Sequence, residues 1–311
     1  MGRTRRRPAS RAREEATVAP VRLVRLVRPM HPVRPVRPVR PVRLARLVRP
    51  ALAAAAACLL GVAAPTASRG EALTLSYLVG WGHLTLAEAE VSYRQSGSRY
   101  RLAGSGQTRG FLALLFSWQG RAETEGVLQA GGRQPLVHEH EATSNRKTRW
   151  TRVAWNGGPA PETEARPPAD PGKVTPVPEA SMAGTRDPFT VLLSVLDRLA
   201  ETGRCEADAK VWDGRRRYDL SIRHLGRQRL SADRPWAYEG VAVGCALEFE
   251  RIGGFWREAS RWRTTDDAAP DRRVVWAAEL APGKWVLVRA EVDTRYGTVV
   301  GRLRTDAAAT D

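Results

Sequence analysis

From Leu73 onward the chain alternates apolar and polar residues with a period of two, and no other feature of the sequence constrains the fold as strongly. The alternation is visible over 73–81 and 84–93, and it returns in the C-terminal third of the chain. Short turn sequences at 96–98 and 281–283 separate neighbouring runs. Half-buried strands joined by short turns pair antiparallel. The sequence therefore predicts a mainly β protein, with a curved antiparallel sheet that forms a partial or closed barrel and one or two short helices packed on it.

Two apolar segments interrupt the alternation and predict these helices. The run GFLALLFSW at 110–118 predicts a short one. The clearer helix follows Asp187, which is a good N-cap residue, has Pro188 in its first turn and ends at Gly203. Apolar residues at spacings of three and four give this helix one apolar face, so it is expected to pack on the sheet.

A long loop precedes the second helix. Seven prolines lie between residues 156 and 178, and the whole stretch 156–186 is predicted to be a proline-rich crossover. Such a segment could divide the chain into two halves, but strand patterns of the same kind occur on both sides of it. We therefore expect a single β-rich domain at 69–305, followed by a disordered tail at 306–311.

The first 68 residues are predicted to be a disordered, basic leader that ends in a cleaved signal peptide. Fifteen of the 50 Lys and Arg residues lie in the first 50 positions, where a Val-Arg-Pro repeat cannot form a helix or a core. An uncharged, alanine-rich stretch follows at 51–68. A basic run, a short apolar stretch and then small residues is the layout of a secretory signal, here at about 30–68. The mature protein is therefore expected in the periplasm.

The details of this leader leave alternatives open. Translation could start at Met1 or at Met30, and cleavage is expected near Ala67 or Ser68. A membrane anchor through an uncleaved 51–67 segment, or through a lipidated Cys58, is the alternative to a released protein. In either case membrane contact is expected only through the signal segment.

The extreme basicity belongs to the leader and not to the domain. Of the formal charge of +17, the first 50 residues carry +13, which leaves 35 basic and 31 acidic side chains in the rest of the chain. A nearly balanced domain of this kind gives no electrostatic footprint for nucleic acid, so nucleic-acid binding is not expected.

Two cysteines remain after the signal, Cys205 and Cys245. An even pair in an oxidising compartment indicates one disulfide bond, which would close a loop of about 41 residues and stabilise the fold by roughly 4 kcal/mol. A pair of metal-binding thiolates is the alternative, although the sequence has no CxxC motif and no histidine cluster near either cysteine.

Five segments resemble, in the same order, the family known as domain of unknown function 3108, a group of bacterial exported proteins. They are GFLALLFSWQGRAETEG, GTRDPFTVLLSVL, CEADAKVWDGRRRYDLSI, YEGVAVGCALEFERIGGF and VRAEVDTRYGTVVGRL. The resemblance covers about residues 73–305, with Trp212 where the family usually has Phe. It implies a β-rich envelope protein in which Cys205 pairs with Cys245, and it brings no activity with it.

No motif points to catalysis or to a cofactor. The sequence lacks G-x-S-x-G and HExxH, and no pair of carboxylates stands out. His138 and His140 share one face of a strand, but two histidines are too few for a zinc site, so this strand is expected to be exposed and metal-free. We therefore expect no enzyme, no metal and no cofactor, with an exported hydrolase as a less favoured alternative.

The stretch VWDGRRRYDL at 211–220 predicts a β-hairpin. If Asp213 and Gly214 form a two-residue turn, Arg215 and Arg217 point away from the core and Arg216 lies on the core side. Strand geometry then separates the three arginines, which argues against a phosphate site. A longer turn would shift this register.

The favoured hypothesis is a non-enzymatic binder or carrier of an apolar envelope component such as a lipid. The apolar helices at 111–116 and 189–199 could cap the concave side of the sheet, and aromatic side chains often line such pockets. The candidate pocket residues are Phe111, Phe116, Trp118, Trp212, Arg216 and Tyr218. The alternative is an envelope assembly or protein-interaction module, with a partner on a sheet edge or on the proline-rich loop.

Overall fold

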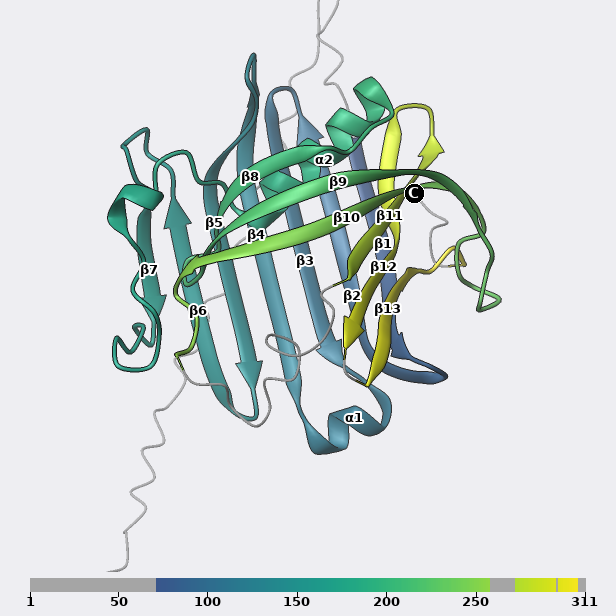
Figure 1. Ribbon diagram of the computed structural model, residues 1–311, viewed down its shortest axis with the longest axis horizontal. Helices are drawn as coiled ribbons and strands as arrows, with labels where there is room; N and C mark the ends of the chain where they lie inside the picture. Colours follow the sequence, from purple (N-terminus) through teal and green to yellow (C-terminus); the bar gives the residue numbers. More distant parts are fainter. Residues whose placement is uncertain (1–70, 258–271, 295, 307–311) are drawn as a thin grey trace, which may run out of the picture. The chain divides into compact units, whose positions relative to one another are not determined.

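The computed structural model describes residues 71–257, 272–294 and 296–306, which form an antiparallel sheet of thirteen strands with two α-helices (Figure 1). The strands are β1 (Glu71–Trp81), β2 (Leu84–Ser96), β3 (Arg99–Thr108), β4 (Trp118–Gln129), β5 (Gly132–Ser144), β6 (Lys147–Ala154), β7 (Glu162–Arg166), β8 (Ala207–Trp212), β9 (Arg217–Leu230), β10 (Gly240–Gly253), β11 (Arg273–Ala281), β12 (Lys284–Thr294) and β13 (Gly297–Leu303). The predicted leader and signal segment, and all of the predicted tail except Asp306, lie outside the described residues.

The strand order explains the shape of the sheet. It runs β7-β6-β5-β4-β3-β2-β1-β13-β12-β11-β10-β9-β8, so the chain meanders to one edge, crosses to the other and returns until β13 pairs with β1. In Figure 1, β8, β9 and β10 cross in front of β3 to β6. The sheet is not closed, because β7 and β8 do not pair with each other. The predicted mainly β fold with a curved, partly closed sheet is confirmed.

Helix α2 (Pro188–Thr202) lies on the concave side, in contact with β4 and β5 on one side and with β8 and β12 on the other. Its predicted ends are confirmed. One carboxylate oxygen of Asp187 accepts hydrogen bonds from the backbone N–H groups of Phe189 and Thr190, at 2.9 and 3.0 Å. Gly203 ends the helix with a φ of 70°, a conformation that favours glycine.

The other predicted helix forms but does not pack as expected. Helix α1 (Gly110–Leu115) has no buried residue, and Phe111 and Leu114 are 67% and 82% exposed. It connects β3 to β4 at one end of the sheet (Figure 1). The expectation that residues 111–116 cap the concave side is wrong. This helix has only six residues, and the longer helix α2 occupies the concave side.

The proline-rich stretch 156–186, which was predicted to be a loop, contains regular secondary structure. It contains β7, which adds to β6 as an edge strand, and a 3-10 turn at Glu179–Ser181. Isolated bridges also join Val174 to Trp256 and Arg186 to Val211. Proline limits the length of such strands but does not prevent them at a sheet edge, where one side needs no hydrogen bonds.

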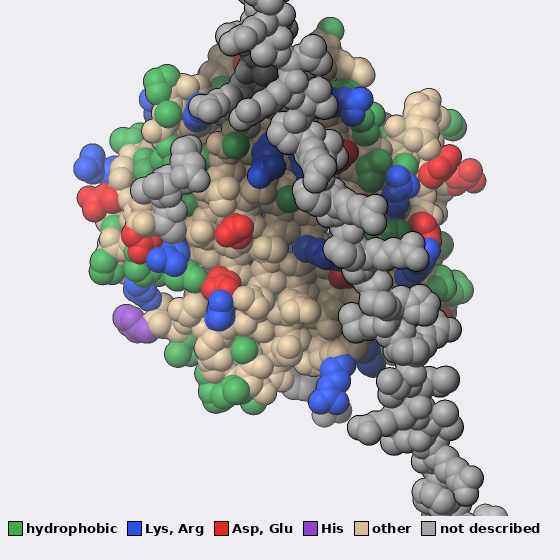
Figure 2. Space-filling view, turned by 180° about the vertical axis from the view of Figure 1, so that it is seen from behind, with side chains coloured by type: hydrophobic (Ala, Val, Ile, Leu, Met, Phe, Trp, Pro, Cys, Tyr) green, Lys and Arg blue, Asp and Glu red, His purple; other side chains and the backbone are tan. Residues whose placement is uncertain are grey.

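The two faces of the first half of the sheet differ in chemistry. On the convex face, arginine and glutamate face each other across neighbouring strands, as in Arg101–Glu123 at 2.6 Å and Arg121–Glu141 at 3.2 Å. Figure 2 looks onto this face and shows acidic and basic side chains side by side. The concave face carries the apolar side chains, so the fold directs its interior toward α2.

The predicted disulfide bond is present between Cys205 and Cys245. It joins the segment that follows α2 to the middle of β10, and both sulfur-bearing side chains are buried beside Val195, Leu199 and Val243. The C-terminal end of α2 is therefore tied covalently to the wall of the sheet.

The hairpin at 211–220 has a four-residue turn, so the predicted two-residue turn is wrong and the longer one is right. Trp212 pairs with Arg217, which shifts the register. Arg217 is consequently buried, with its Nε donating to the carbonyl of Ser181 at 2.8 Å, while Arg216 is exposed. The cause is Asp213, whose carboxylate accepts hydrogen bonds from the backbone of both Arg215 and Arg216.

Candidate functional site

A cavity of about 660 Å³, here called the apolar cavity, lies between α2 and the concave face of the sheet. Its walls come mainly from β1, β2, β12 and one row of α2, and most of the side chains are aliphatic. The alternation of β1 and β2 directs every second residue into it, and α2 contributes residues spaced four apart. The principal wall residues are Leu73, Leu75, Tyr77, Val79, Val91, Tyr93, Leu192, Leu196, Ala200, Trp285 and Leu287.

One polar pair interrupts these walls. The guanidinium of Arg133, on β5, donates to both carboxylate oxygens of Asp197, on α2, at 2.5 and 2.7 Å. It also donates to the hydroxyl of Tyr93 at 3.0 Å and lies over the ring of Tyr100 at 5.1 Å. Burial alone would lower the pKa of Arg133, but its hydrogen bonds to Asp197 and Tyr93 raise the pKa overall. The side chain of Arg133 is 7% exposed and that of Asp197 is 39% exposed, so the pair marks where the cavity meets solvent.

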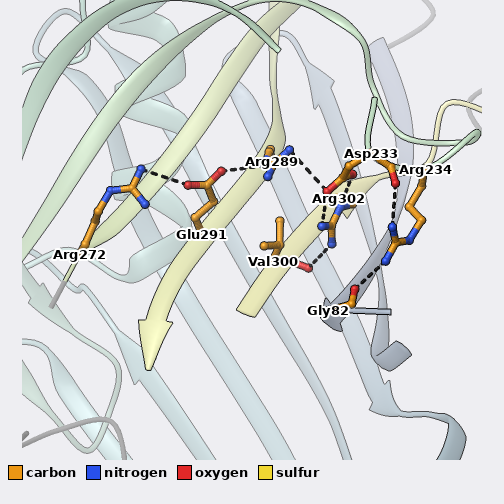
Figure 3. Close-up of polar contacts among 8 residues, drawn as sticks. All are labelled: Gly82, Asp233, Arg234, Arg272, Arg289, Glu291, Val300 and Arg302. Carbon is orange, nitrogen blue, oxygen red and sulfur yellow. Dashed lines mark hydrogen bonds and ion pairs between the residues drawn. The ribbon is translucent and has the colours of Figure 1, made fainter. Parts of the chain in front are cut away.

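A chain of charges lies along β12 and β13, near the other side of the cavity (Figure 3). Arg289, which lines the cavity, lies 2.7 Å from a carboxylate oxygen of Glu291 and 3.7 Å from one of Asp233. Asp233 accepts two hydrogen bonds from Arg302, and these bonds, together with the positive charge of Arg302 and Arg289, lower the pKa of Asp233. The connection between β9 and β10 is thereby fixed to the strands that form the cavity wall.

A buried polar network fixes the start of α2. The hydroxyl of Thr124 donates to Asp187 at 2.6 Å, so its oxygen is left to accept from Nδ1 of His138 at 2.8 Å. Thr190 bonds the other oxygen of Asp187 and also contacts the hydroxyl of Tyr100 at 2.8 Å. Burial lowers the pKa of His138, against the opposing effect of Asp187. The expectation of an exposed strand at this histidine is wrong, because β5 lies inside the sheet and faces α2.

The six candidate pocket residues do not meet in the apolar cavity. Phe111 and Phe116 are exposed on or beside α1. Trp212 is buried, with Nε1 donating to Thr163 at 2.9 Å, and the ring of Tyr218 lies 5.5 Å from that of Phe249.

The last two candidates, Trp118 and Arg216, line a different cavity. The wall residues of the apolar cavity on β1 and β2 were detectable from the alternation of the sequence. The sequence did not indicate that Arg133 lines the cavity, because no local pattern distinguishes it from the other arginines.

No group of three or more His, Cys, Asp or Glu side chains within the described part of the chain is arranged to hold a metal ion. Neither of the two described α-helices is long and apolar enough to cross a membrane.

Comparisons with known proteins give a family and a distant structural likeness. A model of the family described as "Protein of unknown function (DUF3108)" matches residues 76–304. Among solved structures, the beta-barrel-like protein of domain of unknown function DUF1849 from Brucella abortus is 9% identical, with 75% of this chain and 95% of that chain covered and a TM-score of 0.39. No curated protein matches the sequence.

Proposed function

The chain belongs to the family described as protein of unknown function (DUF3108), and we propose that it binds an apolar ligand, such as the acyl chain of a lipid, in the apolar cavity. The observation that carries the proposal is the cavity itself, about 660 Å³ of space between α2 and the sheet with mostly aliphatic walls. Pockets of about 300–1,000 Å³ with few polar groups are the usual form of small-ligand sites. Each Å² of apolar ligand surface buried there would contribute about 25 cal/mol.

The polar groups of the cavity restrict the ligand further. Arg133 is neutralised by Asp197, and Arg289 lies between Glu291 and Asp233, so neither arginine is left with an unbalanced charge. An apolar chain without a charge at its buried end therefore fits best. A charged headgroup, if there is one, would stay at the rim near Asp197, where the cavity meets solvent.

We also propose that the protein works as a non-enzymatic carrier in the periplasm. The basic leader and the apolar stretch that follows it support export. A disulfide bond persists in oxidising compartments, and the buried Cys205–Cys245 bond is consistent with that location.

Lipid analysis of the protein purified from its own envelope, after expression of the complete chain, tests the proposal. Leu196, on the row of α2 that faces the cavity, is replaced by Trp to fill the space. The control is Leu225→Trp on β9, a site 54% exposed and outside the cavity. We expect lipid with the wild type and with the control, and a loss to background with Leu196→Trp at unchanged circular dichroism. Equal lipid in all three proteins, or none in the wild type, would show that the cavity is not a ligand site.

A second candidate function is docking to an envelope protein, and one observation favours it. Helix α1 presents Phe111, Leu114 and Leu115 at 67%, 82% and 69% exposure, and it contacts β2, which begins at Leu84 with 54% exposure. Exposed apolar groups that gather in this way mark interaction sites. A photo-crosslinker at Leu114 should capture one stoichiometric partner in cells, and a crosslinker at Leu225 should not. Capture of lipid alone at Leu114 would contradict this function.

A further inference from the structure

A second cavity of about 610 Å³, here called the basic cavity, is enclosed by β4 to β6, the β8–β9 turn and residues 167–174. Of its lining residues within the described part of the chain, five are cationic and two are acidic, which gives an excess of three positive charges among them. The cations are Lys147, Arg149, Lys173, Arg215 and Arg216, and the acids are Asp170 and Asp213. The domain as a whole is nearly balanced, so this concentration is local and not a consequence of composition.

Neither acid forms an ion pair with an arginine of the basic cavity among the described residues, although the charge of Asp213 acts favourably on Arg215. Asp170 forms an ion pair with Lys173 at 2.9 Å. Asp213 accepts the backbone N–H groups of Arg215 and Arg216, at 2.8 and 2.7 Å. Within the described residues, no carboxylate lies within ion-pair distance of Arg149, Arg215 or Arg216.

The turn that carries two of these arginines is held rigidly. Gly214, at a φ of 89°, packs on Thr151 so closely that a Cβ there would lie 2.8 Å from the threonine Cβ. A Cβ on Gly254 would lie 1.8 Å from the carbonyl oxygen of Arg215. The backbone of the turn is thus enclosed on both sides, and the directions of its side chains are set by the fold.

The guanidinium of Arg215 is only partly satisfied. Its Nη2 donates to the carbonyls of Trp150, Arg166 and Pro167, at 3.2, 3.1 and 3.0 Å. Its Nε is enclosed and has no hydrogen-bond partner in the described part of the protein. Burial, and then repulsion from Arg149, lower the pKa of Arg215, which an anion nearby would counteract.

The two other arginines are exposed and lie against aromatic rings. The guanidinium of Arg149 is 5.5 Å from the ring centre of Trp256, and that of Arg216 is 5.9 Å from the ring centre of Phe255. These contacts orient the planar groups, and an aromatic ring does not neutralise their charge. Planar guanidinium groups match the oxygen geometry of phosphate.

We propose that the basic cavity is a second binding site, separate from the apolar cavity, which takes a phosphate group through Arg149, Arg215 and Arg216. The excess of three positive charges suits the two negative charges of a phosphate monoester better than the single charge of a carboxylate. The phosphate could belong to a soluble phosphate ester or to a lipid headgroup, and the experiment below separates these sources.

Binding of inorganic phosphate to the full chain is measured by calorimetry at low salt, and binding to phosphatidylcholine vesicles is measured with and without phosphatidic acid. The variants are Arg149→Gln and Arg216→Gln, which change exposed side chains, and the matched control is Arg229→Gln, an exposed arginine on β9 outside the cavity. Each pocket variant should weaken binding by about tenfold, as expected for the loss of one charged hydrogen bond. The control should change it less than twofold.

If free phosphate binds, and the two pocket variants weaken that binding while the control does not, the ligand is a soluble ester. If only vesicles with phosphatidic acid bind, and the variants behave in the same way, the ligand is a lipid headgroup. Either result supports the site. The site would be overturned if the wild type bound neither probe, or if Arg229→Gln and Arg149→Gln lost equal affinity. Leu196→Trp, which fills the apolar cavity and lies outside the basic cavity, should bind the probes as the wild type does, so this test and that of the apolar cavity fail independently.

Discussion

Removal of the Cys205–Cys245 disulfide should destabilise the protein by an amount that can be worked from the fold. The two cysteines are 40 residues apart in sequence. Closing a loop of about that length removes about 13 cal/mol/K from the entropy of the unfolded chain, which is about 4 kcal/mol at 25 °C. For a protein of this size, such a loss lowers the melting temperature by about 8–16 °C. Alanine is the replacement of choice at both positions, because the site is buried and apolar.

The loss should also be uneven along the chain. The disulfide ties the end of α2 to β10, and the same part of α2 carries Leu196 and Ala200, which line the apolar cavity. Hydrogen exchange in the last two turns of α2 should therefore accelerate more than in β2, which pairs on both sides within the sheet.

Urea unfolding followed by circular dichroism tests this, with wild type, wild type plus reductant, and the double alanine variant. Reductant should move the wild type toward the variant and leave the variant unchanged. A difference under about 1 kcal/mol between wild type and variant would refute the chain-entropy argument. Uniform acceleration of exchange would refute the proposed role of the bond in holding α2.

Three further predictions concern the polar groups around α2. Asp187→Ala removes the helix cap and the centre of a buried network, so urea unfolding should show a loss of about 2–4 kcal/mol, and a loss below about 1 kcal/mol would contradict the network. Because burial lowers the pKa of His138, its contribution to stability is present above its ordinary pKa of about 6.5 and is lost as the pH falls through the lowered value. Unfolding free energy should therefore fall from pH 7 to pH 5, and His138→Asn should flatten that dependence; an equally steep curve would contradict it. Asp197→Asn leaves Arg133 buried without its counter-charge and should lower the free energy of unfolding by about 2 kcal/mol. The loss is smaller than for a fully buried pair because the side chain of Asp197 is 39% exposed. Asp197→Leu combined with Arg133→Met should restore most of the lost stability in the same assay.

Much of the fold could be predicted because its signals are local. An alternation of apolar and polar residues can be recognised within a run of about eight residues, and it predicted the strands on both sides of α2. The ends of α2 were equally clear, since Asp187 and Gly203 act within one turn of the helix. The strand order was not predictable, because the pairing of β13 with β1 joins residues more than 200 positions apart.

The hairpin at 211–220 shows why register is harder to predict than strand content. An Asp-Gly pair favours a two-residue turn, and the sequence contains nothing nearby against it. The longer turn exists because Asp213 bonds two backbone N–H groups and because Gly254 admits the carbonyl of Arg215. Gly254 lies about 40 residues further along the chain. The argument against a phosphate site assumed that Arg215 and Arg216 were strand residues, and it does not hold for residues of a turn.

The apolar cavity follows from the way α2 is held at its two ends. At its start, Gly104 lets the ring of Phe189 approach β3 so closely that a Cβ there would lie 3.1 Å from the ring. At its end, the disulfide holds the chain to β10, which lies on the opposite part of the curved sheet. A helix fixed to two separate walls cannot also settle onto β1 and β2, so space remains beside it. Gly104→Leu should therefore displace the start of α2 and change lipid content without altering any residue that lines the cavity.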